Sequence, residues 1–249
     1  MQNKIIYGVP FSQPVRAVMW LMFIKKFPFD LKLINPGSSS QGGSRHTEYL
    51  KKFPTGTIPS FEDPETGFVI SESHAIMCYL CNKYEWHDLY PINPEERAKV
   101  DSYLHLHHRN VREASIGLVA PKVRKDLDFS EDFLKSSRAN IEKAFKAIEN
   151  GWLNNSSFLV GDSMTIADIS AYVEIGQLQS IFTNVYNFDQ YPNIQRWLKD
   201  MRGVDYHEEI HIALYELGDI SKKAPLMETI INANKKAFLI IQETLTKMQ

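Results

Sequence analysis

Cysteine is scarce in this sequence, and it has neither a long apolar run nor an excess of one charge. Two cysteines in 249 residues cannot form the disulfide framework typical of small secreted domains. The most apolar run, AVMWLMFI at 17–24, is too short to span a bilayer and is followed by Lys25. Pro10 interrupts the N-terminus before any signal-peptide pattern develops. These absences predict a cytoplasmic protein without a membrane partner.

The charges are nearly balanced, with 28 Lys and Arg against 30 Asp and Glu and a formal net charge of −2. Such a balance provides no attraction for nucleic acid or for an anionic membrane. Hydrophobic residues make up 43%, which is ordinary for a soluble globular protein. The chain is long enough for one large domain or for two smaller domains, each with its own core.

Two short motifs suggest metal or redox chemistry. The first is Cys78-Tyr79-Leu80-Cys81, a C-x-x-C pattern. Redox pairs of this type draw a low thiol pKa from a helix N-terminus, but the surrounding helix is predicted to begin near Ser71 to Ser73, so both cysteines lie well inside it. A zinc site would need a second pair, which the sequence lacks. Buried helix cysteines are therefore the favoured interpretation.

The second motif is YHEEIH at 206–211, which fits the H-E-x-x-H pattern of zinc proteases. Catalytic zinc needs a third protein ligand. The extended motif expects a histidine where Leu217 stands, and no histidine follows His211. Glu228 and Glu243 remain as alternative ligands. The favoured interpretation is a surface helix whose His and Glu side chains face water, with no metal site.

The first third of the chain alternates strand and helix patterns. KIIYGV at 4–9 and FDLKLIN at 29–35 are predicted strands. The segment between them is a predicted helix with Pro14 in its first turn. A strand, a helix and a strand within some thirty residues predict a βαβ unit with parallel strands.

A Ser- and Gly-rich loop follows at 36–44, and then two short strand patterns, TIPSFED at 57–63 and FVI at 68–70. The tight turn between them predicts an antiparallel hairpin that closes the same sheet. A helix is predicted to begin near Glu72. The N-terminal part is therefore predicted to be βαβ followed by ββα.

Helical periods dominate from Pro94 onward, so the second part is predicted to be all-α. The predicted helices lie near 95–124, 130–154, 165–183, 191–201 and 206–217. Thr165 and Asp168 fit a capping box, in which each side chain accepts from the backbone near the other residue. The tail from Lys222 has a heptad-like spacing, with the positions Met227, Ile231, Asn234, Phe238, Ile241, Leu245 and Met248. Packing on the body of the protein is favoured over pairing with a partner helix.

Three segments of the N-terminal part suggest a binding site. Ser12 lies where the first strand passes into a helix, a position suited both to capping that helix and to binding an anion. Ile58-Pro59 precedes a strand and is a candidate for a cis bond that aims the Ile58 backbone into a cleft. Glu72 and Ser73 open a helix and offer hydrogen-bond donors to a carboxylate.

In this order and spacing, these features resemble the cytosolic glutathione transferases, which have a thioredoxin-like βαβ-ββα domain followed by an all-α domain. The resemblance is to the theta class and covers about residues 1–219. It rests on the segments SQPVRA, IPSFED, SESHAIMCYL, YPINPEERAKVDSYLHLHHRNVR, TIADI and IHIALYELGD. It implies a glutathione-binding domain at 1–85, a helical domain with the hydrophobic substrate site at 93–219, and a C-terminal helical extension at 220–249.

The resemblance also implies roles for single residues. Ser12 is the hydroxyl that stabilises the glutathione thiolate, with Gln13 beside it. Ile58, next to Pro59, offers its backbone to the cysteinyl amide of glutathione. Glu72 and Ser73 hold the γ-glutamyl end. The remaining catalytic group is Arg112, which the resemblance places on the first long helix pointing towards the sulfur. Without the resemblance, a solvated charge near Arg109 is the preferred interpretation.

The sequence departs from the theta pattern near the glycyl end of glutathione. Many theta members carry a Gly-Gln-His segment and a lysine in a G-K-x-P turn. This chain has a longer loop and Thr57 in the turn. Arg45 and His46 are alternative contacts for the glycyl carboxylate, and the sequence does not choose between them.

Tyr7 lies inside the first strand pattern and is predicted to be a core residue rather than the catalytic tyrosine that other classes use. The family implies a homodimer, glutathione as co-substrate, no metal and no other cofactor. Conjugation, peroxide reduction and dehalogenation all remain open as reactions of a small hydrophobic electrophile. The alternative is a non-catalytic protein on the same fold that binds glutathione or hydrophobic ligands, or serves as a scaffold.

Overall fold

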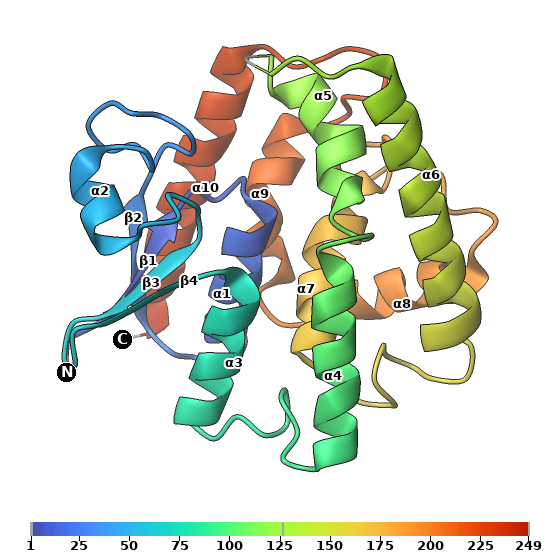
Figure 1. The fold of residues 1–249 in the computed structure, drawn as a ribbon, viewed down its shortest axis with the longest axis horizontal. Coiled ribbons are helices and arrows are strands. Elements are labelled where there is room, and N and C mark those ends of the chain that lie inside the picture. The colour runs from blue at the N-terminus through green and yellow to red at the C-terminus, as the bar shows by residue number, and fades with distance from the viewer. Residues whose placement is uncertain (1, 126, 249) are drawn as a thin grey trace. The chain divides into compact units, whose positions relative to one another are not determined.

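A computed structural model describes residues 2–125 and 127–248 of the chain (Figure 1). The chain divides into two compact units. The N-terminal unit consists of Met1–Glu85, Asp205–Ala213 and Asn234–Gln249, and the helical unit consists of Trp86–Val204 and Leu214–Ala233.

The N-terminal unit is built on a four-stranded mixed sheet. Its strands are β1 (Lys4–Gly8), β2 (Phe29–Leu33), β3 (Ser60–Asp63) and β4 (Phe68–Ser71). The strand order is β2-β1-β3-β4, with β1 parallel to β2 and β3 antiparallel to both β1 and β4. The predicted βαβ unit and hairpin are confirmed.

Helices cover both faces of this sheet (Figure 1). They are α1 (Gln13–Ile24), α2 (Thr47–Lys52) and α3 (Ser73–Lys83). Side chains alternate along a strand, and Tyr7 packs with Tyr49 of α2 and with Phe53 in one buried cluster, as the core prediction for Tyr7 requires. On the other face α1 lies very close to β1, because a Cβ on Gly8 would stand only 2.5 Å from Val15 Cγ2.

Among the described residues of the helical unit, Phe158 and Gly161 form an isolated β-bridge, and the regular elements are all helices. In chain order they are α4 (Pro94–His107), η1 (Ala114–Val119), α5 (Ala120–Val123), α6 (Glu131–Ala147), η2 (Ile148–Trp152), α7 (Ile166–Ile175), η3 (Gly176–Leu178) and α8 (Pro192–Arg202). All ten residues of α7 are buried, so this helix forms the centre of the unit. Its predicted capping box is confirmed, and Asp168 also accepts from Trp197 Nε1 at 3.0 Å.

The prediction of one continuous helix at 95–124 is wrong. Helix α4 ends at His107, and a turn at 108–112 separates it from the π-helical η1. The backbone N–H groups of Arg109 and Arg112 bond three and five residues back, which replaces the regular ladder of an α-helix. The short α5 follows η1 directly, with Pro121, which lacks an N–H, in its first turn.

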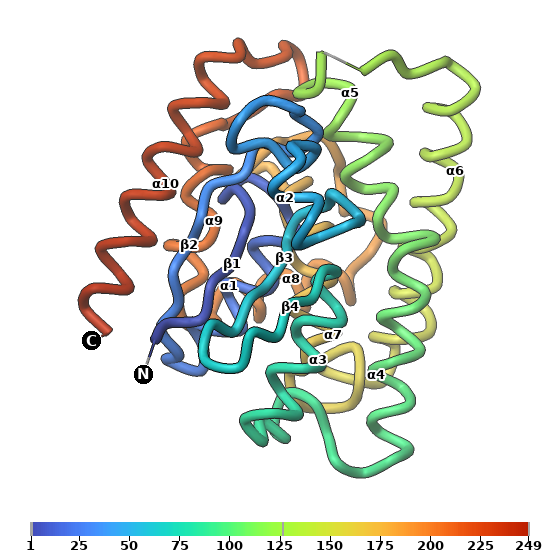
Figure 2. Tube along the Cα trace, turned by 60° about the vertical axis from the view of Figure 1, so that its left-hand side comes forward, coloured from blue at the N-terminus to red at the C-terminus, as the bar shows by residue number. Residues whose placement is uncertain are grey.

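The C-terminal helices are α9 (His207–Leu217) and α10 (Met227–Met248). Figure 2 shows α10 running beside α9. The tail packs on the chain, as predicted. The predicted seam, meaning the seven heptad-like positions from Met227 to Met248, is partly wrong. The buried stripe consists of Ala233, Ala237, Ile241 and Leu245, whereas Met227 and Ile231 are 54% and 46% exposed. Small alanines rather than large apolar residues lie on the buried side in the first half of the stripe.

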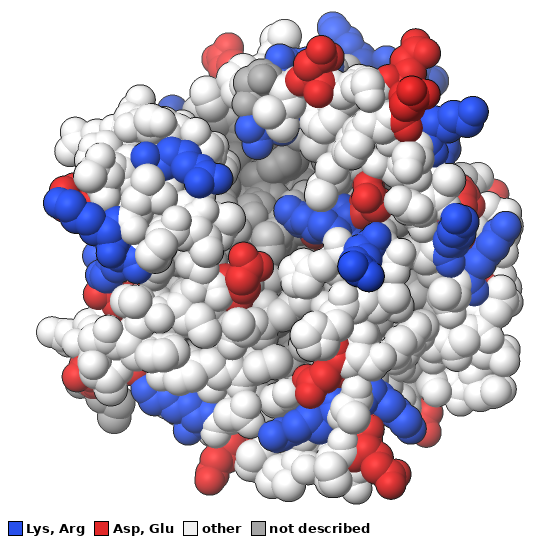
Figure 3. All heavy atoms as spheres, in the orientation of Figure 1, with Lys and Arg blue, Asp and Glu red and all other residues white. Residues whose placement is uncertain are grey.

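Charged side chains of both signs are scattered over the face shown in Figure 3, and neither sign forms a continuous field there. Within the described ranges, none of the helices has both the length and the apolar character needed to cross a membrane.

A buried ion cluster joins β1, β3 and α3 in the N-terminal unit. Asp63 is fully buried and accepts from Lys4 Nζ at 2.9 Å and from Lys83 Nζ. Burial alone would raise the pKa of Asp63, but hydrogen bonds from Lys83 and Lys4 outweigh it and lower the pKa to about 2. The carboxylate therefore remains ionised through the neutral and mildly acidic range.

This cluster predicts a pH-dependent contribution to stability. Because the folded pKa of Asp63 lies below its unfolded value, the contribution is complete above pH ~4 and is lost as the pH falls towards ~2. At neutral pH, Asp63→Asn is expected to lower the free energy of unfolding by about 3 kcal/mol, because Lys83 loses its carboxylate partner and the buried Lys4 keeps only that of Glu65. Urea titrations of both proteins across this range measure the difference, and a difference that does not shrink below pH ~4 would contradict the assignment.

Candidate functional site

Ser12 ends the short turn that follows β1 and occupies the N-cap position of α1. Its backbone is extended, and its N–H donates to the Val9 carbonyl at 3.0 Å. Its carbonyl accepts from the Arg16 N–H at 2.9 Å, so the backbone alone closes the turn. The Ser12 side chain makes no capping hydrogen bond to α1. The hydroxyl therefore stands at a helix N-terminus, where an anion is favoured, without serving as the helix cap.

The turn before β3 is held by a buried tyrosine. The Ile58–Pro59 bond is cis, as predicted. Tyr49 Oη donates to the Thr57 carbonyl at 2.8 Å and lies 3.0 Å from Ser60 Oγ. Packing of α2 against the sheet thus fixes the position of this turn.

Glu72 has a strained backbone. Its φ of 76° and ψ of 116° place a non-glycine residue in a region that L-residues rarely adopt. Such strain costs of order 1–3 kcal/mol and clusters at functional sites. Glu72 occupies the N-cap position of α3, and Ser73, the first helical residue, is 5% exposed.

The sheet register brings these three segments to one edge. Tyr7 on β1 pairs with Ser60 on β3, and Ser60 pairs with Ser71 on β4. The end of β1 that leads to Ser12, the start of β3 after Pro59 and the end of β4 before Glu72 are therefore neighbours. The backbone hydrogen bonds of the sheet thus bring segments some sixty residues apart in the sequence to the same edge.

Arg45 and His46 differ in their surroundings. His46 is the N-cap of α2, and its Nδ1 accepts from the Glu48 N–H at 3.4 Å. Arg45 is exposed, and its Nη1 lies 3.0 Å from the point that a Cβ on Gly56 would occupy. The guanidinium thus lies against the turn that contains Ile58. No carboxylate partner of Arg45 is found among residues 2–125 and 127–248.

Arg112 is not on a long helix as predicted, because it lies in the turn between α4 and η1. The interpretation as a solvated charge is also wrong. Arg112 Nη1 donates to Glu174, whose side chain is 2% exposed. Ser115 Oγ donates to the other oxygen of the same carboxylate, and Gln177 Nε2 donates to Ser115 Oγ at 2.6 Å. Sequence reasoning missed Glu174, because a lone glutamate on an apolar helix has no motif around it.

The H-E-x-x-H helix was predicted to present its histidines to water, and this is wrong. His207 is 2% exposed and His211 is fully buried, with their rings stacked 4.5 Å apart and both in edge contact with Trp20. Burial, followed by the nearby Arg16 charge, lowers the pKa of His211 well below its usual value. Across the described segments, no three His, Cys, Asp or Glu side chains are grouped to hold a metal ion.

The cysteine interpretation agrees with the structure. Both residues lie inside α3 rather than at its N-terminus. Cys81 is 1% exposed and Cys78 is partly buried, and neither forms a disulfide.

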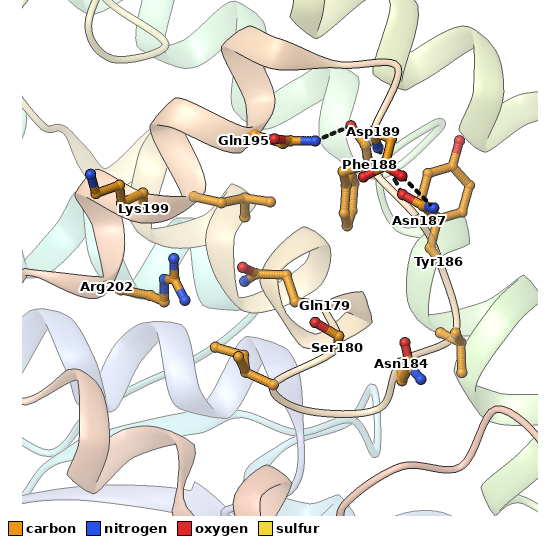
Figure 4. A pocket seen from close by; sticks show the side chains of 13 residues that line it. Gln179, Ser180, Asn184, Tyr186, Asn187, Phe188, Asp189, Gln195, Lys199 and Arg202 are labelled. Atoms are coloured by element: carbon orange, nitrogen blue, oxygen red, sulfur yellow. Dashed lines mark hydrogen bonds between the residues drawn. The ribbon is translucent and has the colours of Figure 1, made fainter.

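The helical unit has a separate pocket of about 650 Å³ between the segment 179–189 and α8 (Figure 4). Gln195 Nε2 donates to the Phe188 carbonyl at its rim, at 2.9 Å, and Lys199 and Arg202 are the cations that line it. None of the residues predicted for the site lines this pocket. The polar residues that line this pocket do not form a sequence motif, so the sequence alone does not predict a binding or catalytic role for them.

The Arg112–Glu174 pair generates a prediction about stability. Arg112→Ala leaves a carboxylate buried without its cation, and we expect the free energy of unfolding to fall by about 3 kcal/mol. Adding Glu174→Gln removes the stranded charge and is expected to restore at least half of the loss. Urea unfolding of the two single variants and the double variant measures both effects. An Arg112→Ala protein as stable as the wild type would show that the pair is not stabilising.

Comparison with known proteins agrees with this geometry. Residues 6–95 match the glutathione S-transferase N-terminal domain, and residues 110–204 match the glutathione S-transferase C-terminal domain. The chain is 26% identical over 227 residues to glutathione S-transferase theta-1 of Homo sapiens, covering 87% of this chain and 91% of that protein. It is 28% identical over 238 residues to glutathione S-transferase T3 of Arabidopsis thaliana, covering 90% of this chain but only 39% of that longer protein.

Among solved structures, human glutathione S-transferase T1-1 in its apo form superposes with a TM-score of 0.74 at 22% identity. The match covers 99% of both chains, and at this identity it supports the fold alone. Together, the two family models cover most of the chain and lie in the order that the fold requires. The chain therefore belongs to the glutathione S-transferase family, within which it is similar to the theta class.

Proposed function

We propose that this glutathione transferase conjugates the thiolate of glutathione to small hydrophobic electrophiles, and that the Ser12 hydroxyl stabilises the thiolate. The proposal rests on the position and the hydrogen bonding of the Ser12 hydroxyl. Its hydroxyl stands at the N-terminus of a twelve-residue helix and is not used to cap that helix. A serine in this position can donate to a bound sulfur.

The chemistry needs only a modest electrostatic effect. A free thiol has a pKa of about 8.5, so only a few per cent is thiolate at neutral pH. A hydrogen bond from Ser12, together with the partial positive charge of the helix N-terminus, favours the charged form. Each unit by which the thiol pKa falls corresponds to about 1.4 kcal/mol. The thiol gives its proton to solvent, and the thiolate sulfur forms a bond to the electrophilic carbon. As that bond forms, either the carbon's bond to its leaving group breaks and the group departs with the electron pair, or the pair of a multiple bond shifts away and is protonated by solvent. Ser12 keeps its own proton throughout.

The same sheet edge supplies the proposed contacts to the tripeptide. The Ile58 backbone next to Pro59 pairs with the cysteinyl amide, and Gln13 follows Ser12 at the first turn of α1. Glu72 and Ser73 hold the γ-glutamyl end, which gives a reason for the strained Glu72 backbone.

Arg45 rather than His46 is proposed to bind the glycyl carboxylate. The ring of His46 already accepts a hydrogen bond as the cap of α2. The Arg45 guanidinium lies against Gly56, one residue before Thr57, which stands where the family pattern has a lysine. A guanidinium suits a carboxylate because it offers two parallel donors.

Arg112 is proposed to help stabilise a thiolate or a departing anion, with Glu174 fixing the orientation of its guanidinium. About 30% of the Arg112 side chain remains exposed, which leaves donors for a ligand. The helical domain, 93–219, is proposed to contribute the hydrophobic substrate site to a glutathione-binding domain at 1–85. A cytoplasmic homodimer that needs no metal and no cofactor beyond its co-substrate completes the proposal. Peroxide reduction is a further reaction open to the same thiolate.

Substitution of Ser12 tests the proposal. Ser12→Ala is expected to lower kcat for conjugation by about 10²-fold, the usual cost of losing one preorganised donor. The KM for glutathione is expected to change less than about threefold, because the other residues that bind glutathione are unchanged. Ser180→Ala, at an exposed serine in the helical unit, is the matched control. If wild-type protein binds glutathione but conjugates no electrophile, the non-catalytic alternative replaces the proposal.

Substitution of Arg45 tests the glycyl contact. Arg45→Ala is expected to raise the KM for glutathione about tenfold with little change in kcat, because a charged hydrogen bond contributes about 1.5–3 kcal/mol. His46→Ala is the control and is expected to leave the KM nearly unchanged. A glutathione analogue with a C-terminal amide should remove the difference between Arg45→Ala and wild type. Equal effects of both substitutions on the KM would contradict the choice of Arg45.

A further inference from the structure

We infer that the C-terminal helix α10 positions the catalytic turn, because Asn234 accepts a hydrogen bond from the backbone N–H of Phe11, the residue before Ser12. The inference rests on the proposed role of Ser12 and assigns a task to a residue 222 positions further along the chain. Asn234 does not touch the reacting atoms, so it is a positioning residue.

The evidence begins with Phe11, whose backbone N–H and carbonyl are both hydrogen-bonded by side chains. The Phe11 N–H donates to Asn234 Oδ1 at 2.9 Å. The Phe11 carbonyl accepts from Arg16 Nη1 at 2.6 Å. The Phe11 N–H belongs to the Pro10–Phe11 peptide and the Phe11 carbonyl to the Phe11–Ser12 peptide, whose own N–H donates to the Val9 carbonyl at 3.0 Å. The peptides on both sides of the Phe11 Cα are thus hydrogen-bonded, which restricts rotation about that Cα and so fixes the position of Ser12.

Arg16 is itself fixed by its surroundings in the N-terminal unit. Its side chain is fully buried in α1. The positive charge of Arg16 contributes to the lowered pKa of His211 on α9, so the histidine beside it remains neutral at physiological pH. His211 on the H-E-x-x-H helix is thus a neutral imidazole within electrostatic range of the arginine that holds the Phe11 carbonyl.

Asn234 is also fixed by the packing of its helix. Ala237, Ile241 and Leu245 on α10 are at most 4% exposed and belong to the N-terminal unit, as Asn234 does. Ala237 and Ile241 lie one and two turns beyond Asn234, so these positions share a helix face. Asparagine is a poorer helix former than alanine, and a partly buried amide is unfavourable unless it is hydrogen-bonded. The bond to Phe11 gives a physical reason for the single polar residue in the predicted seam.

This arrangement differs from a cover over the electrophile. A cover would change the rates for bulky and small electrophiles by different factors. A positioning contact acts on the sulfur through Ser12, so its loss lowers both rates by the same factor. The two roles are therefore separable by experiment.

The test compares Asn234→Ala with Asn232→Ala, an exposed asparagine on the same helix, and measures kcat against pH, which reports the pKa of the enzyme–glutathione complex. Asn234→Ala is expected to raise the apparent pKa by roughly half to one unit and to lower kcat about fivefold at pH ~6.5. The KM for glutathione is expected to change less than about twofold. Asn232→Ala is expected to match wild type.

Conservative and double variants complete the design. Asn234→Asp keeps an acceptor oxygen at the same reach but adds a negative charge that disfavours a nearby thiolate, so it is expected to recover only part of the lost rate. Asn234→Ser, whose hydroxyl is too short to reach Phe11, gives the same test if the alanine variant fails to fold. In a Ser12→Ala background, Asn234→Ala should cause no further shift of the pH profile, because coupled residues are not additive.

Three results would overturn the inference. If Ser12→Ala shifts the pH profile and neither Asn234→Ala nor Asn234→Ser does, the positioning role is wrong while the proposed function stands. If the rate loss depends on the size of the electrophile, α10 acts as a cover instead. If Ser12→Ala itself leaves the profile unchanged, the proposed function fails, and the positioning role falls with it.

Discussion

The register of the four-stranded sheet is the constraint on which the proposed site depends. Tyr7, Ser60 and Ser71 lie in one row across β1, β3 and β4. That row brings the turns carrying Ser12, Ile58 and Glu72 to one edge. A one-residue slip of β3 would turn its side chains to the opposite face. It would also remove the Tyr49 hydroxyl from Ser60 and Thr57. The buried Tyr7, Tyr49 and Phe53 cluster opposes such a slip, because it packs only one face of the sheet.

Three buried carboxylates are hydrogen-bonded by neighbouring groups. Asp63 is bonded by two lysines, and Asp168 accepts from backbone N–H groups and from Trp197. Glu174 receives Arg112 and Ser115. Each carboxylate would be costly without these partners. The chemistry proposed for Ser12 instead needs no protein charge, because a neutral donor and a helix terminus both favour a thiolate.

Much of the fold follows from local sequence signals. The strand alternation, Pro14 at the start of α1, the Thr165 capping box and the Ile58–Pro59 bond were all predictable, because each depends on residues close together in the sequence. The break after His107 was not predictable, because apolar periodicity continues through it and the change lies in the hydrogen-bond ladder. Burial of His207 and His211 was missed for a related reason. Their spacing matches a metal motif, and only the tertiary contact with Trp20 shows that they are core residues. The choice between Arg45 and His46, and the partner of Asn234, likewise depend on contacts between distant segments.

The central claim is that Ser12 lowers the pKa of the glutathione thiol bound beside it. The most direct measurement is the ultraviolet absorbance of the bound thiolate, titrated against pH for wild type and for Ser12→Ala. The account predicts a bound thiol pKa below ~7.5 in wild type, within the range of activated thiols, and a return towards ~8.5 in the variant. Equal pKa values in the two proteins, or a wild-type value that stays near that of free thiol, would contradict it.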